Sequence, residues 1–173
     1  MSNPPDERTS TVANAGGAAG TPKPHGPARV VVEWAGARRF DAGRPGGPTL
    51  RLDGSGETGQ SPVDAVLSAL AACTGIDIVD IFAKRRTPPA LFAVAVEGAR
   101  ADAIPRRLTA IRLDYTIDGE NIQRVQAESF VDLAIVKYCS VRDSLDPSIP
   151  VTYTLTLNGE RGAEQRPMKP ATT

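Results

Sequence analysis

The sequence predicts a single α+β domain with a largely antiparallel sheet. A chain of 173 residues is long enough for one domain with a substantial core. The predicted order is a β-hairpin, a strand, a long helix, two strands, a second helix and a final strand. The paired strands lack the helical crossovers that parallel pairing requires, which favours antiparallel sheets.

The two ends of the chain differ from the centre in composition. Residues 1–28 consist mainly of Gly, Ala, Pro, Ser, Thr and Asn, and residues 160–173 are similar. Segments of this kind cannot bury enough apolar surface to fold. We therefore expect a disordered low-complexity tail at 1–28, one domain at 29–159, and a flexible C-terminal tail at 160–173.

Three short strands open the predicted domain. Residues Arg29–Trp34 are β-branched and apolar, and Gly36 marks a turn into a second arm at Arg38–Asp41. Turn residues 45–48 then lead to a strand at Thr49–Asp53.

The strongest local signal begins the long helix. Ser61 as N-cap, Pro62 at the first helical position and Asp64 three residues after the cap form a capping box. Apolar residues recur at helical spacing from there to Arg86, and Pro88 ends the pattern. The predicted helix has about 26 residues and a length of roughly 39 Å, and it is expected to be buried and central.

Alternating apolar residues predict strands at Phe92–Val96, Ile111–Ile117 and Val151–Leu157. A second helix is expected over Ile122–Lys137, because its apolar residues share one helical face.

Composition excludes several classes of function. Twenty Lys and Arg balance twenty Asp and Glu, so no net field attracts nucleic acid or an anionic membrane. The charge-free apolar stretch Ala65–Ile76 is short for a membrane span, and no secretory signal is apparent, so a cytoplasmic location is expected. The single histidine, His25, lies in the N-terminal tail, which argues against a metal site and a Ser-His-Asp triad.

Two cysteines remain as candidates for chemistry. Cys73 lies in the middle of the long helix, on one stripe with Val66, Leu70 and Asp77. Either cysteine could also be an inert, packed thiol, because free cysteine is among the most buried residue types.

Cys139 directly precedes Ser140, the expected N-cap of a short helical turn in which Asp143 completes a capping box. The partial positive charge of such a helix start favours a thiolate.

The stretch Ser61–Thr74 resembles the signature helix of the OsmC/Ohr family, in which a Pro-led, alanine-rich helix carries the reactive cysteine. Residues Lys137–Val141 resemble the segment that bears the second cysteine of the family, and the resemblance spans Arg29–Gly159. It implies an OsmC-like fold in which antiparallel sheets wrap a long central helix. It also implies an intertwined homodimer with active sites at the subunit interface.

The resemblance further implies a thiol-dependent peroxidase that reduces organic hydroperoxides. The Cys73 thiolate would attack the O–O bond, and Cys139 would condense with the resulting sulfenic acid to form a disulfide. An external dithiol, such as a lipoylated protein, would restore both thiols, and no bound cofactor, nucleic acid or membrane is implied.

The family also uses an arginine to stabilise the thiolate and orient the hydroperoxide. Arg51 is the first candidate, because Arg51–Gly54 resembles the segment that bears it in OsmC-type members, and Arg38 and Arg39 are the alternatives from the first hairpin. The glutamate that clamps this arginine falls at Val63, which places the chain nearer to divergent OsmC-like branches. Asp64 is the carboxylate expected to substitute for it.

Two other functions stay open on the sequence alone. The chain could be a non-catalytic OsmC-fold module that binds a small apolar ligand or senses oxidation through Cys73 and Cys139. It could also be a structural dimer with inert thiols. Thiol reactivity separates these alternatives, and turnover separates an enzyme from a sensor.

Overall fold

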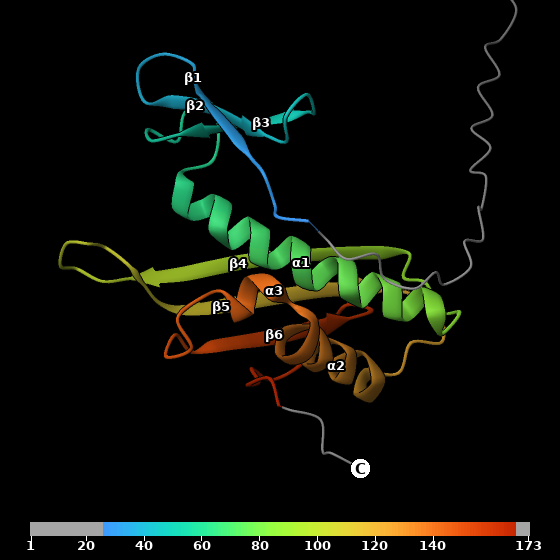
Figure 1. Ribbon diagram of the computed structural model, residues 1–173. Helices are drawn as coiled ribbons and strands as arrows, with labels where there is room; N and C mark the ends of the chain where they lie inside the picture. The colour runs from blue at the N-terminus through green and yellow to red at the C-terminus, as the bar shows by residue number, and fades with distance from the viewer. Residues whose placement is uncertain (1–25, 169–173) are drawn as a thin grey trace, which may run out of the picture.

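The computed structural model describes residues 26–168. Along the chain, a small sheet is followed by a long helix and then by a larger sheet, whose strands are interrupted by a second group of helices (Figure 1). The elements are β1 (Val31–Trp34), β2 (Arg39–Gly43), β3 (Thr49–Asp53), α1 (Pro62–Lys84), β4 (Leu91–Arg100), β5 (Leu108–Asp118), α2 (Arg124–Leu133), the π-helix η1 (Ala134–Tyr138), α3 (Ser140–Asp143), β6 (Val151–Leu157) and β7 (Glu160–Arg161).

The strands form two separate sheets. An antiparallel sheet with the order β1-β2-β3 sits at the N-terminal end of α1, apart from a second sheet with the order β4-β5-β6-β7 (Figure 1). The prediction of an α+β fold with a long helix is therefore confirmed. The small sheet projects from the rest of the chain, so much of its surface is open to a partner.

The expectation of antiparallel pairing is wrong for one pair of strands. β5 and β6 run parallel, with Ile111 opposite Val151 and Ile117 opposite Leu157. The segment between these strands contains α2, η1 and α3, and this helical connection supplies the crossover that a parallel pair needs. The helices were predictable from the sequence, whereas the direction of β6 depends on where they return the chain.

The prediction of a flexible tail at 160–173 is wrong for its first residues. Glu160–Arg161 forms β7 against β6, and the backbones of Gln165 and Tyr153 exchange two hydrogen bonds of 2.8 and 2.9 Å. Residues up to Gln165 are therefore attached to the larger sheet. Most of the predicted N-terminal tail lies outside the described residues, and residues 26–30 have no regular secondary structure.

Helix α1 begins where the sequence predicts it. The Ser61 hydroxyl accepts from the Asp64 N–H at 3.2 Å, and the Asp64 carboxylate accepts from the Ser61 N–H at 3.1 Å. The helix has 23 residues and ends at Lys84, slightly before the predicted end.

The expectation that α1 is buried holds for one face only. Its buried residues are Leu70, Thr74, Gly75, Ile78 and Phe82. Outside this buried stripe, α1 leaves Val66, Ile76 and Val79 exposed. By length and hydropathy α1 could cross a membrane, a test that the core helix of a folded domain also passes.

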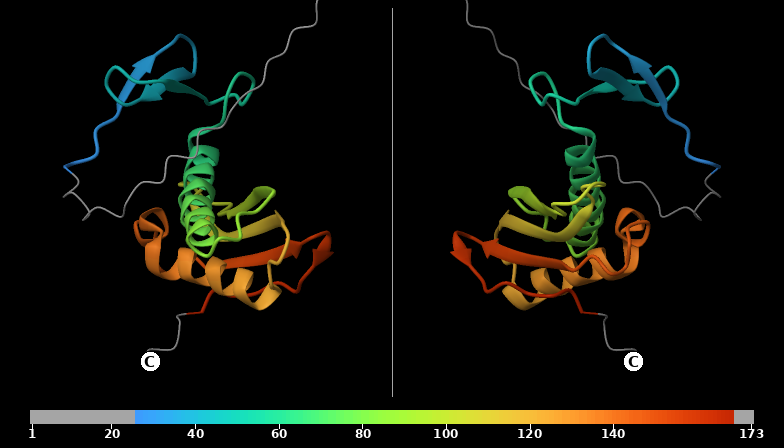
Figure 2. Two further views of the ribbon diagram at one scale, coloured as in Figure 1. Left: turned by 90° about the vertical axis from the view of Figure 1, so that its right-hand side faces the viewer. Right: turned by 90° about the vertical axis from the view of Figure 1, so that its left-hand side faces the viewer.

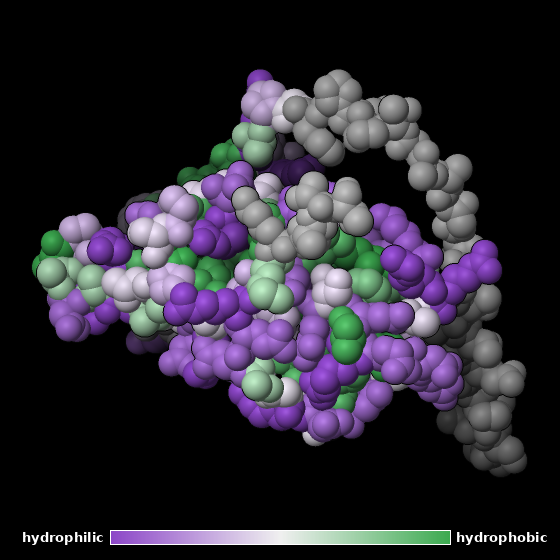
Figure 3. All heavy atoms as spheres, turned by 90° about the horizontal axis from the view of Figure 1, so that it is seen from below, coloured by the Kyte–Doolittle hydropathy of each residue, from purple (hydrophilic) through white to green (hydrophobic). Residues whose placement is uncertain are grey.

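The core lies between the larger sheet and the helices that cover one of its faces. Figure 2 shows α1 and α2 on the same side of this sheet. The Phe82 and Phe130 rings meet edge to face at 5.0 Å between centroids, which joins the two helices. The side of the molecule viewed from below is largely hydrophilic (Figure 3).

Candidate functional site

The fold brings the two cysteines of the chain together. Cys73, in the middle of α1, is partly exposed, whereas Cys139, at the start of α3, is 3% exposed. Both are free thiols, and Cys73 packs against the buried cluster that includes Cys139, close enough to affect the pKa of Cys139. A partly exposed sulfur beside a buried one is the arrangement needed for attack on a substrate followed by disulfide formation.

A local irregularity in the second helix places Cys139. The helix predicted as continuous over 122–137 changes from α to π at Ala134, and the N–H of Cys139 donates to the Ala134 carbonyl at 2.9 Å. A π turn adds one residue per hydrogen-bonded ring and therefore rotates the residues that follow it. Such turns are frequent at functional sites.

The N-cap of α3 is Cys139 and not Ser140 as expected from the sequence. The Cys139 Sγ accepts the N–H of Arg142 at 3.3 Å, as a capping hydroxyl would. The predicted cap was one residue too late, because cysteine is an uncommon capping residue and serine a common one.

Burial raises the pKa of Cys139 to about 11, which overturns the expectation that the helix start favours its thiolate. The N–H of Arg142 opposes this shift, and the hydrogen bond with Cys73 adds to it. Cys139 is therefore a protonated thiol at neutral pH.

We expect the rate of alkylation of Cys139 by iodoacetamide to rise about tenfold per pH unit up to about pH 11 in the folded protein.

The raised pKa of Cys139 also stabilises the folded state. This contribution is fully present below the ordinary pKa of 9.0 and is lost as the pH rises through about 11. The free energy of unfolding of wild type relative to Cys139→Ala should therefore fall between pH 9 and 11. Parallel pH profiles of the two proteins would contradict this expectation.

The turn of α1 that carries Cys73 is fixed to the larger sheet through its neighbour Thr74. The Tyr115 hydroxyl, from β5, donates to the Thr74 Oγ1 at 2.8 Å, and this oxygen donates in turn to carbonyls of the preceding turn. Both side chains are buried, and burial raises the pKa of Tyr115. The phenol therefore stays protonated and keeps donating.

We expect Tyr115→Phe to lower the free energy of unfolding by about 1 kcal/mol, because it removes one buried hydrogen bond and leaves the ring in place. The melting temperature should fall by about 2 to 4 °C. Thr116→Val, on the same strand, is the matched control. Equal melting temperatures for wild type and Tyr115→Phe would exclude a stabilising role for this bond.

Arg51 is held by the carboxylate of Asp41, which was not among the predicted site residues. It lies opposite Asp41 in the β2–β3 register, and its Nη2 donates to the Asp41 Oδ2 at 2.9 Å. The hydrogen bond from Arg51 lowers the pKa of Asp41 below its ordinary value. The signal was present in the sequence, because the predicted hairpin and strand carry an Asp and an Arg that register would bring opposite each other.

Within one chain, Arg51 is remote from Cys73. The small sheet adjoins the start of α1, and Cys73 lies about 17 Å further along the helix at 1.5 Å per residue. The structure therefore brings the two cysteines together but leaves the predicted arginine apart from them.

Of the two alternative arginines, Arg39 is the first residue of β2 and Arg38 lies in the turn before it. Arg39 pairs with Asp53 at 3.7 Å and with Glu57 at 3.9 Å, and Asp53 is buried. Hydrogen bonds from Ser55 and Thr58 hold the pKa of Asp53 at about 2.

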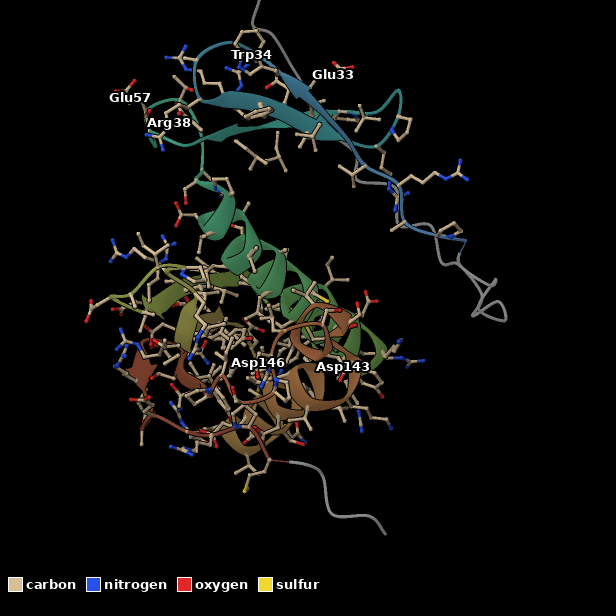
Figure 4. All side chains as sticks on the ribbon, turned by 60° about the vertical axis from the view of Figure 1, so that its left-hand side comes forward. Glu33, Trp34, Arg38, Glu57, Asp143 and Asp146 are labelled. Atoms are coloured by element: carbon tan, nitrogen blue, oxygen red, sulfur yellow. The ribbon has the colours of Figure 1, made fainter. Side chains whose placement is uncertain are left out.

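Arg38 lines an apolar cavity of about 500 Å³ together with Phe40 and Leu52. It is well separated from Asp143 of α3, as Figure 4 shows. Asp64 caps the start of α1 and does not pair with Arg51, which is bound to Asp41.

Among residues 26–168, no group of three or more His, Cys, Asp or Glu is arranged to hold a metal ion.

These features define an α+β protein with a thiol pair between its central helix and the start of a short helix. Residues 54–154 match the model of the OsmC-like protein family. The chain belongs to the OsmC-like family.

Individual relatives agree with this assignment. Protein YhfA of Escherichia coli K12 is 31% identical over 124 residues, which cover 71% of this chain and 92% of YhfA. An OsmC-like protein from Mycoplasma pneumoniae superposes with a TM-score of 0.64 at 19% identity, over 75% of this chain and 95% of the other. An organic hydroperoxide resistance protein OsmC from Legionella pneumophila superposes with a TM-score of 0.58 at 15% identity. The superposition covers 76% of this chain and 99% of the Legionella protein. At these identities the two structures support the fold alone.

Proposed function

We propose that the protein is a thiol-dependent peroxidase that reduces organic hydroperoxides. The contact between the partly exposed Cys73 and the buried Cys139 is the observation that carries the proposal. Membership of a family in which a solved protein is named for organic hydroperoxide resistance supports it.

The proposed cycle uses the different settings of the two sulfurs. The Cys73 thiolate attacks one oxygen of the O–O bond, giving a sulfenic acid and an alkoxide that takes a proton to leave as the alcohol. The Cys139 thiol then attacks the sulfenic sulfur, which forms the disulfide and releases water. A dithiol reduces this disulfide and becomes a disulfide itself.

We also propose that the working unit is a homodimer. The exposed face of α1 and the exposed residues of the small sheet give one chain more apolar surface than a monomer normally leaves open. These residues are Val30, Val31, Val32, Trp34, Phe40, Leu50, Val66, Ile76 and Val79. A second copy would cover this surface, and its small sheet would bring an arginine towards Cys73.

We expect a preference for bulky organic hydroperoxides over hydrogen peroxide. The surface beside the α1 stripe that carries Cys73 is apolar, and an apolar site favours a substrate with apolar substituents. The second-order rate constant for the oxidation of Cys73 by cumene hydroperoxide should exceed that for hydrogen peroxide by at least about tenfold.

The measurement is stopped-flow oxidation of the full chain under single-turnover conditions, followed by quantification of the disulfide. Steady-state consumption with dihydrolipoamide as the reductant then tests turnover. Equal rate constants for the two peroxides would contradict the substrate class, and the absence of any disulfide would contradict the peroxidase.

A further inference from the structure

Asp77 is the carboxylate that lies nearest to Cys73 along α1. The two residues are four positions apart, and both are partly exposed. Side chains four positions apart on a helix are neighbours, with about 5 to 6 Å between their Cβ atoms. Because helical side chains lean towards the N-terminal end of their helix, Asp77 covers the turn that carries Cys73. Its carboxyl group therefore borders the space in which a peroxide meets the Cys73 sulfur.

The surroundings of Asp77 favour its neutral, protonated form. Partial burial is the main cause that raises its pKa, and the negative charge of Asp80 adds to this shift, while Lys84 opposes it. Within residues 26–168 no hydrogen bond stabilises the charged form, in contrast to Asp41, whose pKa is lowered by its bond with Arg51. A carboxyl group with a raised pKa is better able to hold a proton and give it up near neutral pH.

The attack on the hydroperoxide needs a proton donor. The departing alkoxide is a strong base, and its protonation in the transition state lowers the barrier. An arginine guanidinium does not lose its proton in proteins. The Cys139 thiol has a pKa of about 11, so it is a much weaker acid than a carboxyl group. The Tyr115 hydroxyl already donates to Thr74 at 2.8 Å. Asp77 is therefore a stronger acid than these groups.

We propose that Asp77 is the general acid that protonates the alkoxide as it leaves the hydroperoxide. The inference rests on the proposed peroxidase cycle and adds a catalytic residue to its first step. The Cys73 sulfur attacks the terminal oxygen, so that an S–O bond forms and the O–O bond breaks, with its electron pair passing to the alkoxide oxygen. Asp77 transfers its proton to that oxygen, and the alcohol leaves.

The step balances without a further oxidant or reductant. The sulfur loses two electrons and the peroxide gains them, and the sulfenic acid keeps the hydrogen of the terminal oxygen. The Asp77 carboxylate regains a proton from water before the next turnover. Because Asp77 and Cys73 belong to the same helix, its backbone fixes the separation of acid and nucleophile before the substrate arrives.

The test is the substitution Asp77→Asn, which keeps the size of the side chain and removes its acidic proton. Two oxidants are compared: cumene hydroperoxide, which releases an alkoxide, and peroxyacetic acid, which releases acetate. Acetate needs no proton at neutral pH, so its departure does not depend on a general acid. The second-order rate constant for Cys73 oxidation should fall at least about tenfold with cumene hydroperoxide and stay within about threefold with peroxyacetic acid.

Asp80→Asn is the matched control, because it removes the next carboxylate of α1, about 10 Å along the helix from Cys73 at 1.5 Å per residue. It should leave both rate constants within about twofold of wild type, since it is too far away to reach the reacting oxygen. Asp77→Glu keeps a carboxyl group and should restore most of the rate with cumene hydroperoxide. Equal slowing with the two oxidants in Asp77→Asn would indicate a structural role and overturn the inference.

A second measurement uses the wild-type protein and needs no variant. Proton transfer during O–O cleavage should make the solvent deuterium isotope effect about twofold larger with cumene hydroperoxide than with peroxyacetic acid. Equal isotope effects would overturn the inference. Failure of cumene hydroperoxide to oxidise the wild type at all would contradict the peroxidase itself, whereas equal oxidation rates in wild type and Asp77→Asn would overturn the role of Asp77 alone.

Discussion

Cys73→Ser is expected to abolish hydroperoxide consumption, whereas Cys139→Ser is expected to consume one equivalent per subunit and then stop. Cys73 is the partly exposed sulfur, so removing it removes the nucleophile. Cys139 is buried and protonated, so its loss leaves the first attack possible but prevents disulfide formation. Cys139→Ser should therefore accumulate a sulfenic acid on Cys73.

The measurement is dimedone labelling of each variant after one equivalent of cumene hydroperoxide, with the labelled residue located by mass spectrometry. Untreated Cys139→Ser is the control for background oxidation. The assigned roles are wrong if Cys73→Ser consumes peroxide at the wild-type rate, or if dimedone labels Cys139 in Cys73→Ser as fast as it labels Cys73 in Cys139→Ser.

Two features of the thiol site, the start of α1 and the protonation state of Cys139, differ in whether they could be predicted from the sequence. The start of α1 was predictable, because Ser61, Pro62 and Asp64 act locally and their hydrogen bonds form within one turn. The protonation state of Cys139 was not predictable, because it depends on burial by residues distant in the chain. Its position near a helix start gave the opposite expectation, since the partial charge of a short helix is a smaller effect than desolvation.

The direction of β6 could not be predicted from the sequence, whereas the carboxylate partner of Arg51 could. The parallel pairing of β5 with β6 depends on how the helices between them pack, which composition does not reveal. Asp41, in contrast, could have been found by aligning the predicted strands in an antiparallel register. Asp64 was chosen because it is close to Val63 in sequence, yet the carboxylate that reaches Arg51 comes from the neighbouring strand.

Arg51→Ala is expected to slow the oxidation of Cys73 by roughly 100-fold, the usual cost of losing one preorganised charge-stabilising donor. Arg51 is the arginine whose guanidinium is oriented by a two-point contact with a carboxylate, Asp41. Asp41→Asn should cause a smaller loss, because it frees the guanidinium without removing it. Arg38→Ala and Arg39→Ala are the matched controls, and a loss in one of these instead would move the role to the first hairpin.

The distance between Arg51 and Cys73 in one chain makes a further test possible. If the arginine acts across the proposed dimer, inactive Cys73→Ser subunits and impaired Arg51→Ala subunits should complement each other when they are mixed and allowed to exchange. A hybrid dimer then holds one intact site, and random pairing in a two-fold symmetric dimer restores about a quarter of the wild-type rate. If each arginine served its own chain, no hybrid would contain an intact site. Activity that stays at the average of the two separate variants, in a mixture shown by native mass spectrometry to contain hybrids, would therefore exclude an Arg51 contribution across the interface.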